Sequence, residues 1–553
     1  MLSYRKLAMR VLGRPLHTGG GIDSPRPASQ RAAAFILTAA MLTTLAAPAF
    51  AGTWYIENGD ITVKAGKTGN DVTQNNETTY GDTGTVITGK SDKNTVTIEA
   101  KDKGDKVEVK FENVNIDASS RSEAAVSVTG KGDTNIELDG DNKLQSGSGH
   151  AGLEHNKTDT SGELTIQDND KNGSLKAAGG QYGAGIGGAG VNDAQVKITG
   201  GKITATGGEY GAGIGGGFKG SGDVTISGGE IHANGGNYGA GIGGGDYSSG
   251  KVTISGGEIN ATGGYLGAGI GGGEKGRGDV TITGGEITSA TGGKYGAGIG
   301  GGKEGRGDVT IEGNTEVNAA GGAGGAGIGG GYVAKNNSNQ ITIKSNENGS
   351  PTVNAVGGSR DKTTKFGGAG IGAGGDSTAT TDITLEGKVT INATAGKDNA
   401  AIGANGIEQE FPGLAGGTSI TRKDSDKNDI SPLPGDNVPD TDTPSGGGST
   451  GGDSTGGDSA GGDSAGGGSS GGGSADASVQ ESVFPGLVVT DKDGQRISYT
   501  SIRDNNVLSL RVGRFTASLR ASLSTLRQLR AEGIDTITFQ TILCSTTLSV
   551  DEL

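Results

Sequence analysis

The hexapeptide GAGIGG recurs along the middle of the chain at an almost constant interval. Spacings of 28, 28, 28, 29 and 29 residues separate its isoleucines Ile186, Ile214, Ile242, Ile270, Ile299 and Ile328. Ile371 and Ile402 continue the series after an insertion. A period of roughly 20–50 residues is typical of solenoids and repeat arrays. The middle of the chain is therefore expected to fold as a stack of similar units.

The residues within one unit favour strands over helices. After GAGIGGG come GDVTISGG from Gly222 and EIHANGG from Glu230, in which apolar and polar residues alternate. Alternation with a period of two predicts strands, and glycine pairs would interrupt a helix. We therefore predict an all-β parallel β-helix solenoid with coils of about 28 residues, each built from three strands. The large inward aliphatic residues of one coil are predicted to be Ile214, Val224, Ile226 and Ile231.

Composition and charge limit the classes of function. Glycine makes up 115 of the 553 residues, hydrophobic residues 31% and aromatic residues 4%, so one large mixed core is not expected. The formal net charge is −15, and it becomes −20 once residues 1–51, with six basic residues and one acidic residue, are set aside. An acidic chain is repelled by nucleic-acid phosphates, so no nucleic-acid partner is expected.

The ends of the chain differ from the repeats. Residues 1–51 resemble a secretory signal, in which Arg26 and Arg31 precede a short apolar run that ends in Pro48-Ala49-Phe50-Ala51. We expect export to the cell surface or medium, a mature start near Gly52, and no transmembrane span afterwards. The predicted domains that follow are a cap with the first strands (52–105), β-helix repeats (106–423), a disordered Gly/Ser/Asp linker (424–474) and a small α/β module (475–553). In that module we expect a helix over about 515–532 and a strand over 534–543.

The motifs GAGIGGG, GDVTISGG and EI-x-A-x-GG resemble a family of glycine-rich parallel β-helix proteins exported by clostridia-like gut bacteria. The resemblance covers about residues 95–410. It is closest to the carbohydrate-binding members of that group, whose solenoid is shaped like that of pectate lyases. It implies binding of acidic plant polysaccharide and an association with calcium, but it assigns no ligand residue in this chain.

Carboxylates recur at two positions of the repeat. One column holds Glu230, Glu258, Glu286 and Glu316, and another holds Asp223, Asp279 and Asp308, interrupted by Lys251. Like charges about 5 Å apart repel each other, so these side chains must be solvated, screened, paired with a base or bridged by a cation. Ca²⁺ accepts irregular sets of oxygen ligands, which makes these columns the candidate calcium sites.

The candidate sugar-binding residues stand beside the glycine motif. Alternation places Gly211, Gly213 and Gly215 outward, which predicts a strip of sheet bare of side chains. Tyrosines precede this strip at Tyr182, Tyr210, Tyr238 and Tyr295. They either stack inside the core or flank the bare strip, where aromatic rings would bind the apolar faces of sugars. Two basic residues of the insertion, Lys362 and Lys365, could hold a uronate carboxylate.

Nothing in the sequence identifies a catalytic set. His150 and His155 are expected in exposed loops, and no recurring Ser or Asp completes a triad with them. We therefore expect a non-enzymatic protein whose rod binds polysaccharide or a cell-envelope polymer. The alternatives are a structural or adhesive surface protein that uses the rod as a spacer and, third, a polysaccharide lyase.

Overall fold

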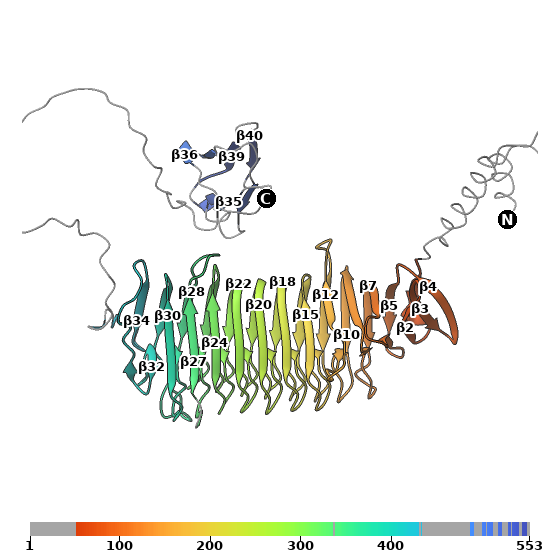
Figure 1. Ribbon diagram of the computed structural model, residues 1–553, viewed down its shortest axis with the longest axis horizontal. Helices are drawn as coiled ribbons and strands as arrows, with labels where there is room; N and C mark the ends of the chain where they lie inside the picture. Colours follow the sequence, from red (N-terminus) through yellow and green to blue (C-terminus); the bar gives the residue numbers. More distant parts are fainter. Residues whose placement is uncertain are drawn as a thin grey trace, which may run out of the picture. The chain divides into compact units, whose positions relative to one another are not determined.

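The computed structural model describes residues 51–335, 338–430 and 433, and seven segments of the C-terminal region: 487–490, 500–504, 506–511, 518–521, 529–531, 533–540 and 545–549. The chain divides into two compact units, residues 1–446 and 447–553, which we describe separately. The first unit is an all-β parallel solenoid, which confirms the predicted fold class. Figure 1 shows its strands following one another in chain order along the rod, from β5 to β34.

Each regular coil contributes one two-residue strand to a 15-stranded sheet and two strand segments to a 19-stranded sheet. The 15-stranded sheet holds β2 (Ile61–Gly66), β3 (Gly69–Gln74), β4 (Glu77–Asp82), β6 (Val96–Ala100), β8 (Val126–Gly130), β11 (Leu153–His155), β14 (Ile186–Gly187), β17 (Ile214–Gly215), β19 (Ile242–Gly243), β21 (Ile270–Gly271), β23 (Ile299–Gly300), β26 (Ile328–Gly329), β29 (Ile371–Gly372), β32 (Ile402–Ala404) and β33 (Ile407–Glu408). The 19-stranded sheet holds β1 (Thr53–Tyr55), β5 (Val86–Ser91), β7 (Lys106–Asp117), β9 (Asp133–Asp139), β10 (Asp141–Gln145), β12 (Leu164–Gln167), β13 (Ser174–Ala178), β15 (Ala194–Ile198), β16 (Lys202–Thr206), β18 (Gly222–Asn234), β20 (Gly250–Thr262), β22 (Gly278–Thr291), β24 (Gly307–Glu312), β25 (Glu316–Ala320), β27 (Asn339–Lys344), β28 (Thr352–Val356), β30 (Thr381–Glu386), β31 (Thr390–Thr394) and β34 (Ser419–Lys423).

The coils stack in the register that the repeat predicts. Parallel pairing joins Ile214 to Ile242 and Val224 to Val252, one period apart. In β18 a register shift around the pair Gly228–Gly229 lets one strand turn a corner and pair with both β15 and β16. The four aliphatic residues predicted to point inward, Ile214, Val224, Ile226 and Ile231, are fully buried. A single aliphatic core therefore runs along the rod, because each coil covers the core of the next.

Both ends of the rod depart from the repeat. At the N-terminal end β3 and β4 form an antiparallel hairpin, with Asn75 and Asn76 at positive φ in its turn. At the C-terminal end β33 folds back antiparallel to β32, and Phe411 and Leu414 are buried in the core. Those two residues belong to the sequence FPGL at 411–414, which thus covers the core at this end of the solenoid. The same four letters recur from Phe484. Phe484 of the second FPGL lies outside the described residues.

The second unit is small and described only in part. Its strands are β35 (Leu487–Thr490), β36 (Thr500–Asp504), β37 (Val507–Arg511), β38 (Ser518–Ala521), β39 (Thr536–Gln540) and β40 (Ser545–Ser549). The predicted helix is wrong over residues 518–521, where β38 pairs antiparallel with β35. Residues 529–531 are helical, and β39 lies within the predicted strand over 534–543. The predicted signal peptide and most of the predicted linker lie outside the described residues.

Candidate functional site

The glycine strands are not the bare strip that alternation predicts. Gly211, Gly213 and Gly215 are all buried, and a Cβ on Gly213 would lie 2.6 Å from the carbonyl oxygen of Gly241. The strip is covered by backbone that follows later in the chain, since the same Cβ would lie 2.8 Å from the backbone nitrogen of Asn234. Within the strip, Ala212 donates its N–H to the carbonyl of Gly216 (2.9 Å). The glycines therefore permit close backbone packing, and no open sugar groove lies on this strand.

The segments before and after the glycine strands are joined between coils at the tyrosines. The backbone N–H of Phe218 donates to the carbonyl of Tyr182 in the preceding coil (2.9 Å), and Asp246 donates in the same way to Tyr210 (2.8 Å). One coil further, Glu274 donates to Tyr238 (2.9 Å). The tyrosine backbone is thus fixed at one edge of every coil, just outside the aliphatic core.

The tyrosine side chains form a stacked column at this edge. The ring of Tyr210 lies 5.2 Å from that of Tyr182 and 5.0 Å from that of Tyr238, with interplanar angles of 8° and 9°. The ring of Phe218 meets Tyr182 and Tyr210 edge-on. None of the three tyrosines is fully buried, and Tyr182 is 37% exposed. Of the two predicted placements, the structure therefore shows the surface one.

A second aromatic group continues along the rod. Leu266 replaces the tyrosine of one coil and is almost buried, but its neighbour Tyr265 is half exposed. Tyr295 packs edge-on against Tyr265 (5.4 Å) and stacks on Tyr332 (5.4 Å). We use the name aromatic edge for the two groups together, which comprise Tyr182, Tyr210, Phe218, Tyr238, Tyr265, Tyr295 and Tyr332.

The insertion loop of residues 359–366 is attached to this second group. Lys294 lies over the rings of Tyr265 and Tyr295 and pairs with Asp361 of the loop (3.0 Å). The hydroxyl of Tyr295 shares a hydrogen bond with that of Thr363 (2.7 Å). Hydrogen bonds from Thr363 and the charge of Lys294 hold the pKa of Asp361 well below its ordinary value, so this carboxylate stays ionised.

The loop also presents the two predicted basic residues. Lys362 and Lys365 are both exposed, and Lys365 lies over the ring of Phe366. They flank Thr363 in sequence, so the structure places them next to the end of the aromatic edge that contains Tyr295. Sequence reasoning named these residues separately but did not connect them, because the contacts between Tyr295 and Thr363 span 68 positions.

Two buried carboxylates lie under the other part of the aromatic edge. Asp246 is 2% exposed and Glu274 is 6% exposed, and they occupy equivalent positions in consecutive coils. Lys303 approaches Glu274 (3.4 Å), whereas one carboxylate oxygen of Asp246 is buried without a hydrogen-bond partner in the described part of the chain. Burial, together with the charge of Glu274, raises the pKa of Asp246 from 3.8 to about 6. Sequence analysis missed both residues, since the repeat has no constant residue at this position.

This raised pKa predicts how stability depends on pH. The folded chain binds the Asp246 proton more tightly than the unfolded chain does, so the free energy of unfolding falls as pH rises from about 4 to about 6. We expect Asp246→Asn to stabilise the rod by about 1–2 kcal/mol above pH 7 and to have little effect near pH 4. Urea unfolding at several pH values measures the difference. Asp382→Asn, at an exposed position of β30, is the control. A stabilisation that does not depend on pH would contradict this assignment.

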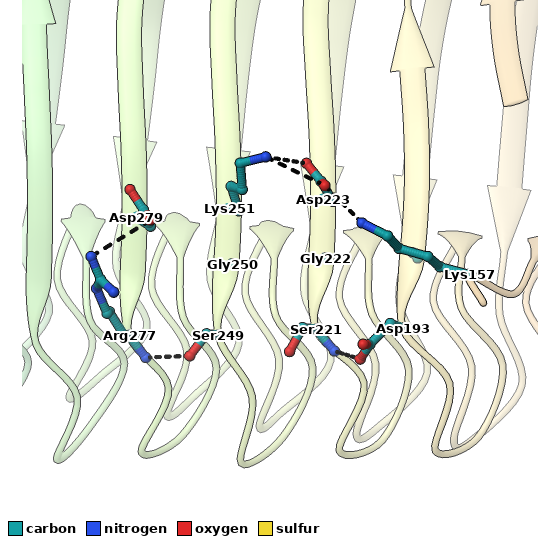
Figure 2. A pocket seen from close by; sticks show the side chains of 11 residues that line it. Lys157, Asp193, Ser221, Gly222, Asp223, Ser249, Gly250, Lys251, Arg277 and Asp279 are labelled. Carbon is teal, nitrogen blue, oxygen red and sulfur yellow. Dashed lines mark hydrogen bonds and ion pairs between the residues drawn. The ribbon is translucent and has the colours of Figure 1, made fainter. Parts of the chain in front are cut away.

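The predicted aspartate column is paired with bases. Figure 2 shows Asp223 between Lys157 and Lys251, whose Nζ atoms lie 2.8 and 3.4 Å from its carboxylate. Burial raises the pKa of Asp223, but the two lysines outweigh it and hold the pKa below its ordinary value. Arg277 approaches Asp279 (3.5 Å) and Asp308 (2.6 Å). All of these residues except Asp308 line a shallow cavity of about 230 Å³. Of the arrangements predicted for the aspartate column, the structure shows pairing with a base.

The glutamate column is less uniform. Glu230 pairs with Lys202 (2.7 Å) and contacts His232 (3.0 Å), which together hold its pKa below the ordinary value. Glu258, Glu286 and Glu316 follow in register on β20, β22 and β25. Burial and the two neighbouring glutamates raise the pKa of Glu286. Over the described residues no cluster of three or more His, Cys, Asp or Glu side chains is arranged to hold a metal ion, so calcium at this column stays a prediction.

One of the two histidines is placed differently from the expectation: His150 lies in the loop before β11 and is one-third exposed, but His155 does not lie in a loop. His155 was expected in an exposed loop, but it is 3% exposed at an inward position of β11, and its Nδ1 bonds to the carbonyl of Gln195 (2.8 Å). Burial lowers the pKa of His155, which keeps the ring neutral. The expectation for His155 is wrong because the sequence around it does not follow the repeat, so strand β11, which pairs with β8, was not recognised.

Comparison with known proteins agrees with this architecture. A family model described as a beta helix repeat matches residues 196–218, 224–246, 252–274, 280–303 and 309–332. No curated protein and no solved structure matches the chain. Across the described residues no helix is long and apolar enough to cross a membrane. The matched segments are those of the regular coils, so the chain carries beta helix repeats over the part that bears most of the aromatic edge.

Proposed function

We propose that the rod is an exported protein that binds acidic polysaccharide along its aromatic edge without cleaving it. The observation that carries this proposal is the position of the aromatic residues. The core is mainly aliphatic, with Phe111 and Phe411 near its two ends, whereas the seven residues of the aromatic edge lie outside it, along one side of consecutive coils. Aromatic residues are scarce in this chain, and their concentration on one surface favours a role in recognition.

The spacing of the rings suits a repeating ligand. Rings stacked at 5.0–5.2 Å cover one another's faces, so the inner tyrosines offer ring edges and hydroxyl groups to solvent. An extended polysaccharide offers hydroxyl groups on each successive sugar, and a chain lying along the rod meets one tyrosine per coil. Weak contacts repeated along one chain add up to useful affinity.

The basic loop gives the proposal its preference for acidic sugars. Lys362 and Lys365 are exposed, and the pairs Lys294–Asp361 and Tyr295–Thr363 attach their loop to the aromatic edge. A uronate carboxylate can therefore pair with a lysine while neighbouring sugars contact the tyrosines. Calcium bound by Glu258, Glu286 and Glu316 would reduce the repulsion between an acidic rod and an acidic polysaccharide, and we include it in the proposal.

The test is a titration of the exported chain with polygalacturonate. We expect Lys362→Ala combined with Lys365→Ala to weaken binding about tenfold at low salt, because two charge contacts are lost. Lys335→Ala, a change at an exposed lysine in the preceding part of the insertion, serves as the control. Equal affinities for the double variant and the wild type would contradict the assignment of the loop. Ultraviolet absorbance followed in parallel detects the unsaturated product that a lyase would form.

A further inference from the structure

The strands of the 15-stranded sheet are longer and more exposed near the N-terminal end of the rod than in the later coils. β6 and β8 have five residues each and expose part of their outer face, whereas later coils contribute only two buried residues, such as Ile214 and Gly215 of β17. In register across β6, β8 and β11 lie Thr97, Ser127 and Glu154. Val126, Val128 and Leu153 beside them are buried in the core, so alternation directs these three side chains outward.

A cavity lies where this open face ends. Its volume is about 260 Å³, and its lining residues are Thr95, Val96, Thr97, Ser122, Glu123, Ala124, Ser127, His150 and Glu154. One wall comes from the segment before β8 and another from the segment before β11. The size is below the usual range of about 300–1,000 Å³ for drug-sized ligands, so it suits a small polar group or a single sugar.

His150 and Glu154 form a fixed pair in this cavity. The carboxylate of Glu154 is 7% exposed, and its two oxygens contact His150 Nδ1 (2.7 Å) and Asn156 Nδ2 (2.9 Å). With the carboxylate ionised, this contact places a proton on Nδ1. The other ring nitrogen, Nε2, is then either an acceptor or, when protonated, a donor for a ligand. The side chain of His150 is one-third exposed, so a ligand in the cavity can reach it.

We propose that this cavity binds a neutral sugar residue, with His150, Thr97 and Ser127 as its hydrogen-bonding contacts. The lining contains no Lys or Arg, its one basic side chain, His150, is paired with Glu154, and Glu123 and Glu154 are acidic, which disfavours a uronate or another anion. Hydroxyl groups and an imidazole are suited to a polyhydroxyl ligand. The described contacts include no hydrogen bond between His150 and a hydroxyl group, so the nucleophile–base contact that a hydrolase uses is not seen in this cavity. The cavity shares no lining residue with the aromatic edge, although it lies next to that edge, since the carbonyl of His150 accepts the N–H of Gly180, two residues before Tyr182 (2.9 Å).

The test uses histidine resonances of the exported chain labelled at histidine. From residue 52 onward the chain contains three histidines, so the buried His155 and His232 are internal controls beside His150. Cellobiose, xylobiose, mannobiose and galactobiose are the neutral probes, and digalacturonate is the acidic probe. We expect at least one neutral disaccharide to shift the His150 signals saturably, while digalacturonate leaves them unchanged.

Matched variants identify the contacts. Thr97→Val and Ser127→Ala each remove a hydroxyl group from a partly exposed position without adding bulk, and together they are expected to weaken binding of the neutral disaccharide about tenfold while the unfolding midpoint is retained. The proposal is overturned if no neutral disaccharide moves His150, if digalacturonate moves it equally, or if the double variant binds as the wild type does. Failure of polygalacturonate binding at the aromatic edge leaves these outcomes unchanged.

Discussion

Replacing Gly264 by alanine is expected to destabilise the rod by about 3 kcal/mol or more, because the added methyl group would overlap the neighbouring coil. A Cβ at this position would lie well under 3.0 Å from the carbonyl oxygen of Gly236. The backbone cannot move away freely, since Gly264 donates its N–H to Gly239 (3.0 Å). Its φ is outside the left-handed region, so the effect would be steric and not conformational.

The same close approach recurs in every regular coil, which makes the prediction general. Gly208, Gly236, Gly293 and Gly322 each face a carbonyl of the preceding coil in the same way. The midpoint of urea unfolding measures the change. Thr262→Ala, two residues away on an exposed site, is the matched control and should change stability by less than about 0.5 kcal/mol. If Gly264→Ala is as mild as Thr262→Ala, the coils are not packed as closely as described.

Removing Tyr210 and Tyr238 together is expected to weaken polygalacturonate binding at least tenfold while the rod remains folded. The two rings lie outside the core and are partly exposed, so we expect the rod to remain folded after it loses the apolar area they bury and their stacking, which is worth about 0.5–1.5 kcal/mol per ring pair. Binding loses two successive contacts of a repeating ligand, and a tenfold change corresponds to about 1.4 kcal/mol. Calorimetric titration of Tyr210→Ala/Tyr238→Ala measures the affinity.

Two further variants separate the possible causes. Tyr210→Phe/Tyr238→Phe retains the rings and removes the hydroxyl groups, so it reports whether hydrogen bonds or ring edges bind the sugar. Tyr80→Ala removes a tyrosine that is 74% exposed on the N-terminal hairpin, away from the aromatic edge, and should leave affinity unchanged. A double-alanine variant that unfolds would instead assign these tyrosines a structural role. Unchanged affinity in a folded variant would remove them from the site.

The fold could be predicted because the repeat is read directly from the sequence. The spacing of the isoleucines gives the coil length, and the alternation in Val224-Thr225-Ile226 gives both strand and inward face. The coil length and the inward face can both be read from periodicity in the sequence, because stacked coils place equivalent residues in register. The tail lacks such a repeat, and its leucine spacing suggested a helix where Leu519 lies in β38.

The candidate site was predictable only in its parts. The tyrosine positions follow from the repeat, but Gly211, Gly213 and Gly215 are buried by close backbone contacts that alternation alone cannot show. Asp223 pairs with Lys157, 66 residues away, as well as with Lys251 of the same column, so spacing within the repeat accounts for only one of its two bases. Asp246 and Glu274 occupy a position held by Phe218 in one coil and Lys303 in another, and no periodic signal marks it.

The most direct test of the account is a titration of the exported wild-type chain with polygalacturonate, carried out with calcium and with a chelator. The account predicts saturable binding, no unsaturated product, and weaker binding after chelation if the glutamate column holds calcium. Formation of product would make the protein a lyase. The absence of saturable binding under both conditions would contradict the central claim and leave the rod as a spacer.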